Sequence, residues 1–127
     1  MAETAKIAIV DDEVHIRALL EQTLEDLEGE PELLTAANGA EGLALIERER
    51  PQLVFLDVMM PLMNGYEVCA AVRQNPALAG TTIVMLTAKG QESDRTRGLE
   101  TGAHYFVTKP FDPDEILDLA RGILQPA

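Results

Sequence analysis

Short apolar runs alternate with amphipathic stretches along the chain, and this alternation restricts the fold more than any other feature. Five runs rich in β-type residues predict strands over 6–10, 32–37, 52–57, 81–88 and 103–108. The segments between and after them have helical spacing and predict helices over 13–29, 39–50, 65–75, 91–102 and 112–124. A helix after each strand implies right-handed crossovers and a parallel sheet. We therefore expect an α/β fold, a doubly wound five-stranded parallel sheet covered on both faces.

The ends of several predicted helices have recognisable signals. Val14, Leu20, Leu24 and Leu27 lie near helical spacing, and Gly29 is the expected stop of the first helix. Asn38 is expected to cap the second helix. In the last helix Asp112 is the expected N-cap, with Pro113 at the first helical position.

Length, charge and cysteine content restrict the class of protein. The 127 residues fit one domain, 1–127, with no second domain expected in this chain. A single cysteine, Cys69, allows no intrachain disulfide. We find no signal peptide and no transmembrane run, so we expect a cytoplasmic protein. The net charge of −12 repels nucleic-acid backbones and anionic lipid, so we expect neither as a direct partner.

Polar and charged residues follow four of the predicted strands. Asp11 and Asp12 follow the first strand, Asp57 ends the third, Thr87 lies near the end of the fourth, and Lys109 follows the fifth. Because the carboxyl ends of parallel strands form the binding edge of such a sheet, these side chains are expected to converge. Each taken alone has an ordinary explanation, such as a helix start or a solvated lysine, but the joint pattern does not.

Three clustered carboxylates repel one another, and a divalent cation relieves that repulsion. Hard oxygen ligands select Mg²⁺, with Mn²⁺ as a substitute. An ionised Asp57 beside the metal, with a lysine and a hydroxyl nearby, can attack phosphorus and form an aspartyl phosphate. Positioning and charge neutralisation are what phosphoryl transfer requires, and this set of residues supplies both.

These motifs resemble the receiver domains of two-component response regulators over essentially the whole chain. The matching segments are "VDDE" at 10–13, "DVMMPLMNG" at 57–65, "MLTA" at 85–88 and "GAHYFVTKPF" at 102–111. The resemblance implies a flavodoxin-like (CheY-like) three-layer sandwich with strand order 2-1-3-4-5. It also implies a phosphorelay role, in which a sensor histidine kinase or a histidine phosphotransfer protein supplies the phosphoryl group. A downstream protein target or an effector domain would then respond.

The same resemblance assigns roles around the acceptor. Asp57 is the phosphoacceptor and a metal ligand, Asp12 binds Mg²⁺ directly, Asp11 binds it mostly through water, and the backbone carbonyl of Met59 completes the protein ligands. The domain is then no enzyme acting on an external substrate. It catalyses only its own phosphorylation and its slow self-dephosphorylation.

The resemblance further assigns the residues of a switch. Lys109 pairs with Asp57 and then with a phosphoryl oxygen, and the Lys109–Pro110 bond is cis. Thr87 moves to the phosphoryl group, and an aromatic side chain, here Phe106, turns inward in response. Phenylalanine replaces the frequent tyrosine at that position, so contacts through a hydroxyl are lost. The affected face combines the helix over 91–102, the strand over 103–108 and the helix over 112–124.

Two departures from the family pattern bear on signalling. Met59 and Lys89 occupy the positions that tune the lifetime of the phosphoryl group, and neither can align an attacking water, so we expect slow dephosphorylation. Tyr105 and Leu119 stand where related regulators carry opposite charges for dimerisation. We therefore expect a monomer or a weak, phosphorylation-dependent dimer, with a rather apolar docking face for a protein partner.

Two other functions are alternatives to the phosphorelay hypothesis. A phosphatase of the haloacid-dehalogenase type also uses a strand-end aspartate and magnesium, but it needs a second aspartate where this chain has Met59. A degenerate receiver that acts only as a phosphorylation-independent interaction module would not need the full set of Asp11, Asp12, Asp57, Thr87 and Lys109.

Overall fold

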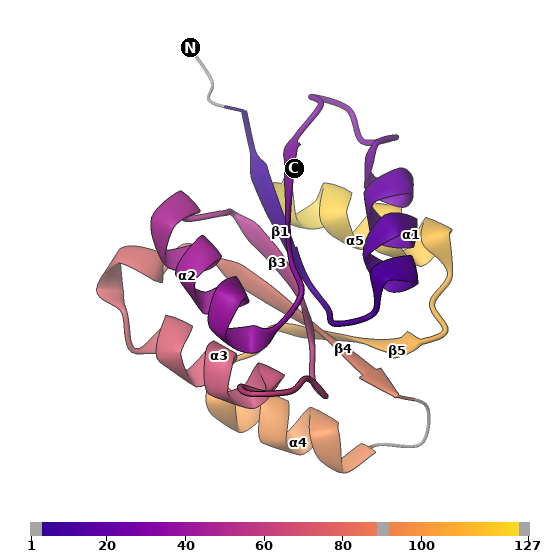
Figure 1. Ribbon diagram of the computed structural model, residues 1–127. Helices are drawn as coiled ribbons and strands as arrows, with labels where there is room; N and C mark the ends of the chain where they lie inside the picture. Colours follow the sequence, from indigo (N-terminus) through magenta and orange to yellow (C-terminus); the bar gives the residue numbers. More distant parts are fainter. Residues whose placement is uncertain (1–3, 89–91, 125–127) are drawn as a thin grey trace.

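Five parallel strands form one sheet in a computed structural model of the chain (Figure 1). It describes the backbone of residues 4–88 and 92–124, and the side chains of these residues except 92–95. The strand order is β2-β1-β3-β4-β5, which confirms the predicted doubly wound topology. The strands are β1 (Lys6–Val10), β2 (Glu32–Ala36), β3 (Leu53–Asp57), β4 (Thr82–Ala88) and β5 (Tyr105–Lys109).

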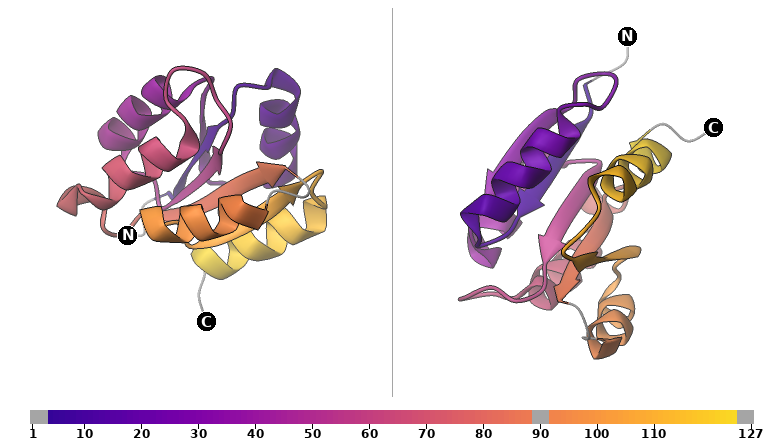
Figure 2. Two further views of the ribbon diagram at one scale, coloured as in Figure 1. Left: turned by 90° about the horizontal axis from the view of Figure 1, so that it is seen from below. Right: turned by 90° about the vertical axis from the view of Figure 1, so that its right-hand side faces the viewer.

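A helix follows each strand. These are α1 (Val14–Leu24), α2 (Gly39–Glu49), α3 (Gly65–Arg73), α4 (Glu92–Thr101) and α5 (Pro113–Leu124), with a short 3₁₀ turn at Pro76–Leu78. Helices α2, α3 and α4 lie on one side of the sheet, and α1 and α5 lie together on the other (Figures 1 and 2). The domain is therefore the expected three-layer sandwich.

The strands supply both faces of the core because their side chains alternate. On β1, Ala8 and Val10 face the side of α2 and α3, whereas Ile7 and Ile9 face α1 and α5. Every residue of the central strand β3 is buried. A strand buried on both faces explains why its sequence is a continuous apolar run up to Asp57.

Several predicted helix ends agree with the structure. The side chain of Asn38 accepts a hydrogen bond from the Glu41 amide at 2.8 Å and caps α2. Asp112 precedes α5, and its Oδ1 accepts from the Asp114 amide at 2.9 Å. Local hydrogen bonding of this kind depends on neighbouring residues alone, which is why the sequence predicts it well.

The first helix differs from the prediction. Helix α1 ends at Leu24 rather than near Gly29, and Leu27 reaches the core from a turn with 5 % of its surface exposed. Val14, which shares the helical spacing of Leu20, Leu24 and Leu27, is 68 % exposed at the start of the helix. The acidic side chains of Glu25, Asp26 and Glu28 accumulate where the negative end of the helix dipole lies, which disfavours further helical turns.

Among the described residues, no helix is long and apolar enough to cross a membrane.

Gly65 brings the start of α3 against the end of β3. Its amide donates to the Val58 carbonyl at 2.9 Å, and a Cβ atom built on it would lie 2.4 Å from the backbone oxygen of Asp57. The neighbouring Asn64 and Glu67 form a reciprocal capping box at the same helix start. The loop after Asp57 is therefore fixed by backbone contacts that leave no room for a side chain.

We predict that Gly65→Ala destabilises the domain by about 2–3 kcal/mol, because backbone atoms cannot yield as a flexible side chain would. Urea unfolding followed by circular dichroism measures the change. Gly80→Ala is the matched control, since a Cβ at Gly80 meets nothing within 4 Å. Equal stability of the two variants would contradict this account of Gly65.

Candidate functional site

Asp57 lies at the carboxyl end of the central strand, inside the protein. It is 5 % exposed, and it pairs in register with Leu86 on β4. The following amide, Val58 N–H, donates to the Leu86 carbonyl at 3.3 Å, so the backbone on both sides of the acid is held by β4 and α3. The sequence brings the acid here because four apolar residues before it form the buried strand.

Asp11 and Asp12 come from the end of the neighbouring strand β1. The Asp11 amide continues the sheet by donating to the Ala36 carbonyl at 3.2 Å, and its side chain has no exposed surface. Oδ1 of Asp11 accepts from the Glu13 amide at 2.9 Å, while Arg17 Nη1 donates to the Asp11 carbonyl at 2.7 Å. Asp12 is exposed to solvent.

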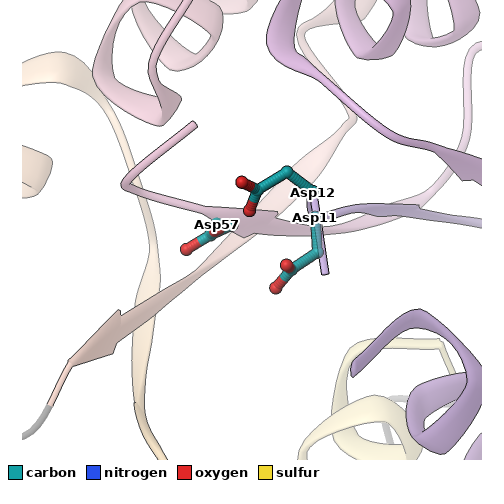
Figure 3. A group of neighbouring side chains, drawn as sticks. All are labelled: Asp11, Asp12 and Asp57. Atoms are coloured by element: carbon teal, nitrogen blue, oxygen red, sulfur yellow. The ribbon is translucent and has the colours of Figure 1, made fainter. Parts of the chain in front are cut away.

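The three aspartates surround one small space (Figure 3). One carboxylate oxygen from each of Asp11, Asp12 and Asp57 lies within 4.8 Å of the others. Oδ2 of Asp11 is buried, and a charged lysine, Lys109, lies 2.9 Å from it. Clustered carboxylate oxygens are the donor set that a hard divalent cation requires, so the residues fit Mg²⁺.

Lys109 supplies the positive charge of the site. Its Nζ lies 2.9 Å from Oδ2 of Asp11, 3.3 Å from Oδ1 of Asp57 and 3.5 Å from Oε1 of Glu13. Burial alone lowers the pKa of Lys109, but the carboxylates of Asp11 and Asp57 outweigh burial and raise the pKa above its ordinary value. The lysine is therefore held charged. The peptide bond between Lys109 and Pro110 is cis, as the resemblance implied.

Asp57 itself is destabilised as an anion. Burial, and then the negative charge of Asp11, raise the pKa of Asp57 from 3.8 to about 7, although Lys109 opposes the shift. Because the ionised form of Asp57 is poorly stabilised, an added positive charge nearby would stabilise it strongly. The electrostatics thus favour a cation beside Asp57, in agreement with the donor set.

The remaining predicted residues lie around this cluster. Thr87 is buried near the end of β4, and in the register the next pair along is Ala88 with Lys109. Met59 has a side chain 73 % exposed and lines a pocket that also contains Asp57 and Lys109. Phe106 is half-buried on β5, and its ring lies over α4, where a Cβ on Gly98 would come 2.5 Å from Cε1. Lys89 lies outside the described residues.

Two residues of the site were missed by the sequence reasoning. Glu13 adds a third carboxylate beside Lys109, and Arg17 donates to the Asp11 carbonyl from one turn into α1. The position of Glu13 directly after the two aspartates of "VDDE" was a sequence signal for its place in the site. Nothing in the sequence indicated Arg17, because an arginine within a helix is ordinarily exposed and solvated.

A doubly wound domain with three carboxylates and a lysine at the switch point of the sheet is a receiver-type signalling domain. A family model described as "Response regulator receiver domain" matches residues 7–121, and the chain belongs to this family of two-component systems. It is 35% identical, with a TM-score of 0.86, to the chemotaxis response regulator CheY4 of Vibrio cholerae, over 96% of this chain and 100% of that chain. The crystal structure of a putative response regulator from Chloroflexus aurantiacus is also similar, with a TM-score of 0.88 and 35% identity over 96% of this chain and 98% of that chain.

Similar curated proteins are longer than this chain. One is the alkaline phosphatase synthesis transcriptional regulatory protein PhoP of Bacillus subtilis, 43% identical over 94% of this chain and 48% of that protein. Another is the probable transcriptional regulator ycf27 of Porphyra purpurea, 45% identical over 96% of this chain and 48% of that protein. The chain thus spans about half the length of these relatives.

We predict that Asp57→Asn stabilises the metal-free domain at alkaline pH by about 2–4 kcal/mol, since it removes a buried anion while Lys109 keeps Asp11 as a partner. The folded-state pKa is raised, so Asp57 favours the fold only when protonated, and wild-type stability falls as pH rises from about 4 to about 7. The two proteins should therefore be nearly equal in stability at low pH.

Urea unfolding in a chelator at several pH values measures this difference. Asp26→Asn is the control, because Asp26 is exposed on the turn after α1. A stabilisation by Asp57→Asn that did not change with pH would contradict the electrostatic explanation.

Proposed function

We propose that this domain accepts a phosphoryl group on Asp57 from a phosphohistidine of a sensor histidine kinase or a histidine phosphotransfer protein. The observation that carries the proposal is the buried Asp57 carboxylate, which is clustered with two further aspartates and lies 3.3 Å from a charged lysine. Membership of the receiver family supports it. The domain would act as a switch that catalyses only its own phosphorylation and dephosphorylation, and not as an enzyme with an external substrate.

In the transfer, an oxygen of Asp57 forms a bond to phosphorus as the phosphorus–nitrogen bond of the donor breaks. The electron pair of that bond goes to the imidazole nitrogen. The donor histidine leaves as a neutral imidazole that carries a proton on one of its two nitrogens. Asp57 must be ionised to attack, and Lys109 favours this form by its charge. The rigid strand ends keep the carboxylate in position, which is most of what this reaction requires.

Asp11, Asp12, Asp57 and the carbonyl of Met59 would hold Mg²⁺. Its chemical contribution there is to neutralise the negative charge of the phosphoryl oxygens as they meet the carboxylates. Asp11 and Asp12 are suited to this because their strand end is fixed by the sheet and by Arg17, independently of Asp57.

The phosphoryl group would reorganise the positive charge of the site. Phosphorylation replaces one carboxylate by a group of about −1.5 to −2 charge with three acceptor oxygens. Lys109 lies near enough to Asp57 to pair with one of them, and the Thr87 hydroxyl would pair with another as it moves toward the site. These contacts would then link the phosphoryl group to β4 through Thr87 and to β5 through Lys109.

Phe106 would carry the change to the surface. Its ring fills the space that Gly98 leaves in α4, so its position and that of α4 depend on each other. Withdrawal of Thr87 would open space near β5 for the ring and so shift an existing equilibrium between two arrangements.

The face formed by α4, β5 and α5 is the proposed output surface. It contains a groove of about 630 Å³ in which Tyr105, Phe106 and Leu119 lie beside the acids Asp112, Asp114, Glu115 and Asp118. A downstream protein or an effector domain would bind here. The relatives named as transcriptional regulators support an effector in the longer proteins, while the charge of −12 argues against nucleic-acid binding by this domain itself.

We predict a mass increase of one phosphoryl group after incubation with acetyl phosphate and Mg²⁺, and its absence in Asp57→Asn and in samples with a chelator. Intact-protein mass spectrometry measures it. Asp26→Asn, which leaves the cluster intact, should be modified like the wild type. An unmodified wild type would overturn the phosphorelay proposal in favour of a phosphorylation-independent interaction module.

We predict that the phosphorylated protein, freed of donor, loses its phosphoryl group slowly. The Met59 side chain, exposed beside Asp57, offers no carboxylate or amide to align an attacking water. Met59→Glu should therefore shorten the lifetime, whereas Met59→Leu should not, and the decay of the phosphorylated mass species distinguishes them. A wild-type half-life of seconds would contradict the prediction.

A further inference from the structure

The carboxylate of Glu13 has no structural role in the helix that it begins. Glu13 is the N-cap residue of α1, yet its side chain makes no capping hydrogen bond. Oε1 instead lies 3.5 Å from Lys109 Nζ, and Oε2 lies 3.2 Å from Nε2 of the exposed His15. The side chain remains 46 % exposed, so the charge stands at the border between the site and solvent.

Glu13 also lines a pocket to which Asp57 belongs. This pocket has a volume of about 140 Å³ and is lined by Glu13, Asp57, Val58, Met59, Leu86, Ala88 and Lys109. Glu13 and Lys109 are its charged residues besides the acceptor, and the other lining residues are apolar. A phosphodonor that reaches Asp57 by this pocket therefore passes within range of the Glu13 charge.

We propose that Glu13 is a donor-selecting residue, which disfavours small anionic phosphodonors relative to donors with an uncharged nitrogen leaving group, such as phosphohistidine. The inference rests on the proposed function of Asp57 and adds the class of donor to it. Two effects act in the same direction. The Glu13 carboxylate repels a dianionic donor, and it competes with that donor for Lys109.

The reactions to be compared differ in the bond that breaks. With acetyl phosphate, Asp57 forms its bond to phosphorus while the phosphorus–oxygen bond breaks and the electron pair leaves with acetate. With phosphoramidate, whose nitrogen is already protonated at neutral pH, the phosphorus–nitrogen bond breaks, and the nitrogen takes the electron pair and leaves as neutral ammonia. At neutral pH acetyl phosphate carries one negative charge more than phosphoramidate, so repulsion by Glu13 affects it more.

The test is the second-order rate of phosphorylation by each donor in wild type, Glu13→Gln and Glu13→Asp, at Mg²⁺ concentrations that saturate each protein. We expect Glu13→Gln to increase the rate with acetyl phosphate about 3- to 10-fold at low ionic strength, and the rate with phosphoramidate by less. The gain should shrink toward unity in about 1 M salt. Glu13→Asp retains the charge but shortens the side chain. If repulsion dominates, this variant should keep the wild-type preference for donors. If competition for Lys109 dominates, it should lose part of that preference.

Glu25→Gln is the matched control. It makes the same change of charge at the other end of α1, roughly 18 Å away by the rise of an α-helix, and should leave both rates unaltered. Equal rate changes with both donors in Glu13→Gln, or a change that persists in high salt, would overturn the inference. An unphosphorylated wild type would instead overturn the proposed function, so the two failures are distinguishable.

Discussion

The contact of one lysine with several carboxylates is the interaction on which the rest of this structure depends. Lys109 lies within 3.5 Å of Asp11, Asp57 and Glu13, and two of these acids are almost fully buried. One positive charge does not balance them, and burial together with the charge of Asp11 raises the pKa of Asp57 to about 7 in spite of Lys109. Without the fold, the carboxylates would repel one another and separate into solvent. The fold must therefore hold the cluster together, and the unbalanced negative charge favours a cation at the site.

The scaffold holds the cluster through backbone contacts more than through side chains. The aspartates extend from strands whose register is fixed on both sides, and the loop after Asp57 is closed by Gly65 and by the capping box of α3. These bonds do not depend on the charges of the site. The protonation of Asp57, or the arrival of a new group there, can thus change the charge of the cluster while the strand ends stay in place. Rigid support of this kind is required where like charges are kept close for function.

The sequence predicted most of the fold and most of the residues that the structure brings together at the site, and the exceptions have two causes. The strands and the caps at Asn38 and Asp112 follow from periodicity and from near neighbours, which a sequence displays directly. The order of the strands followed instead from the resemblance to receiver domains, and the structure confirms it. The end of α1 and the exposure of Val14 depend on the balance between tertiary packing and local charge. The contacts of Glu13, Arg17 and Phe106 depend on the direction of long side chains in the folded molecule. Sequence spacing places these residues on an element but does not show what they touch.

The arrangement of β5 suggests how charge at the site and shape at the surface are connected. Lys109 and Phe106 belong to the same five-residue strand, the first in contact with Asp57 and the second packed over Gly98 in α4. A strand paired along its length with β4 moves as a unit more readily than it distorts. A new partner for Lys109 therefore alters the balance of forces on an element that also positions the Phe106 ring. Coupling of this kind needs no chain of specific contacts across the domain, since one strand reaches both places, and two arrangements of the ring suffice for a switch.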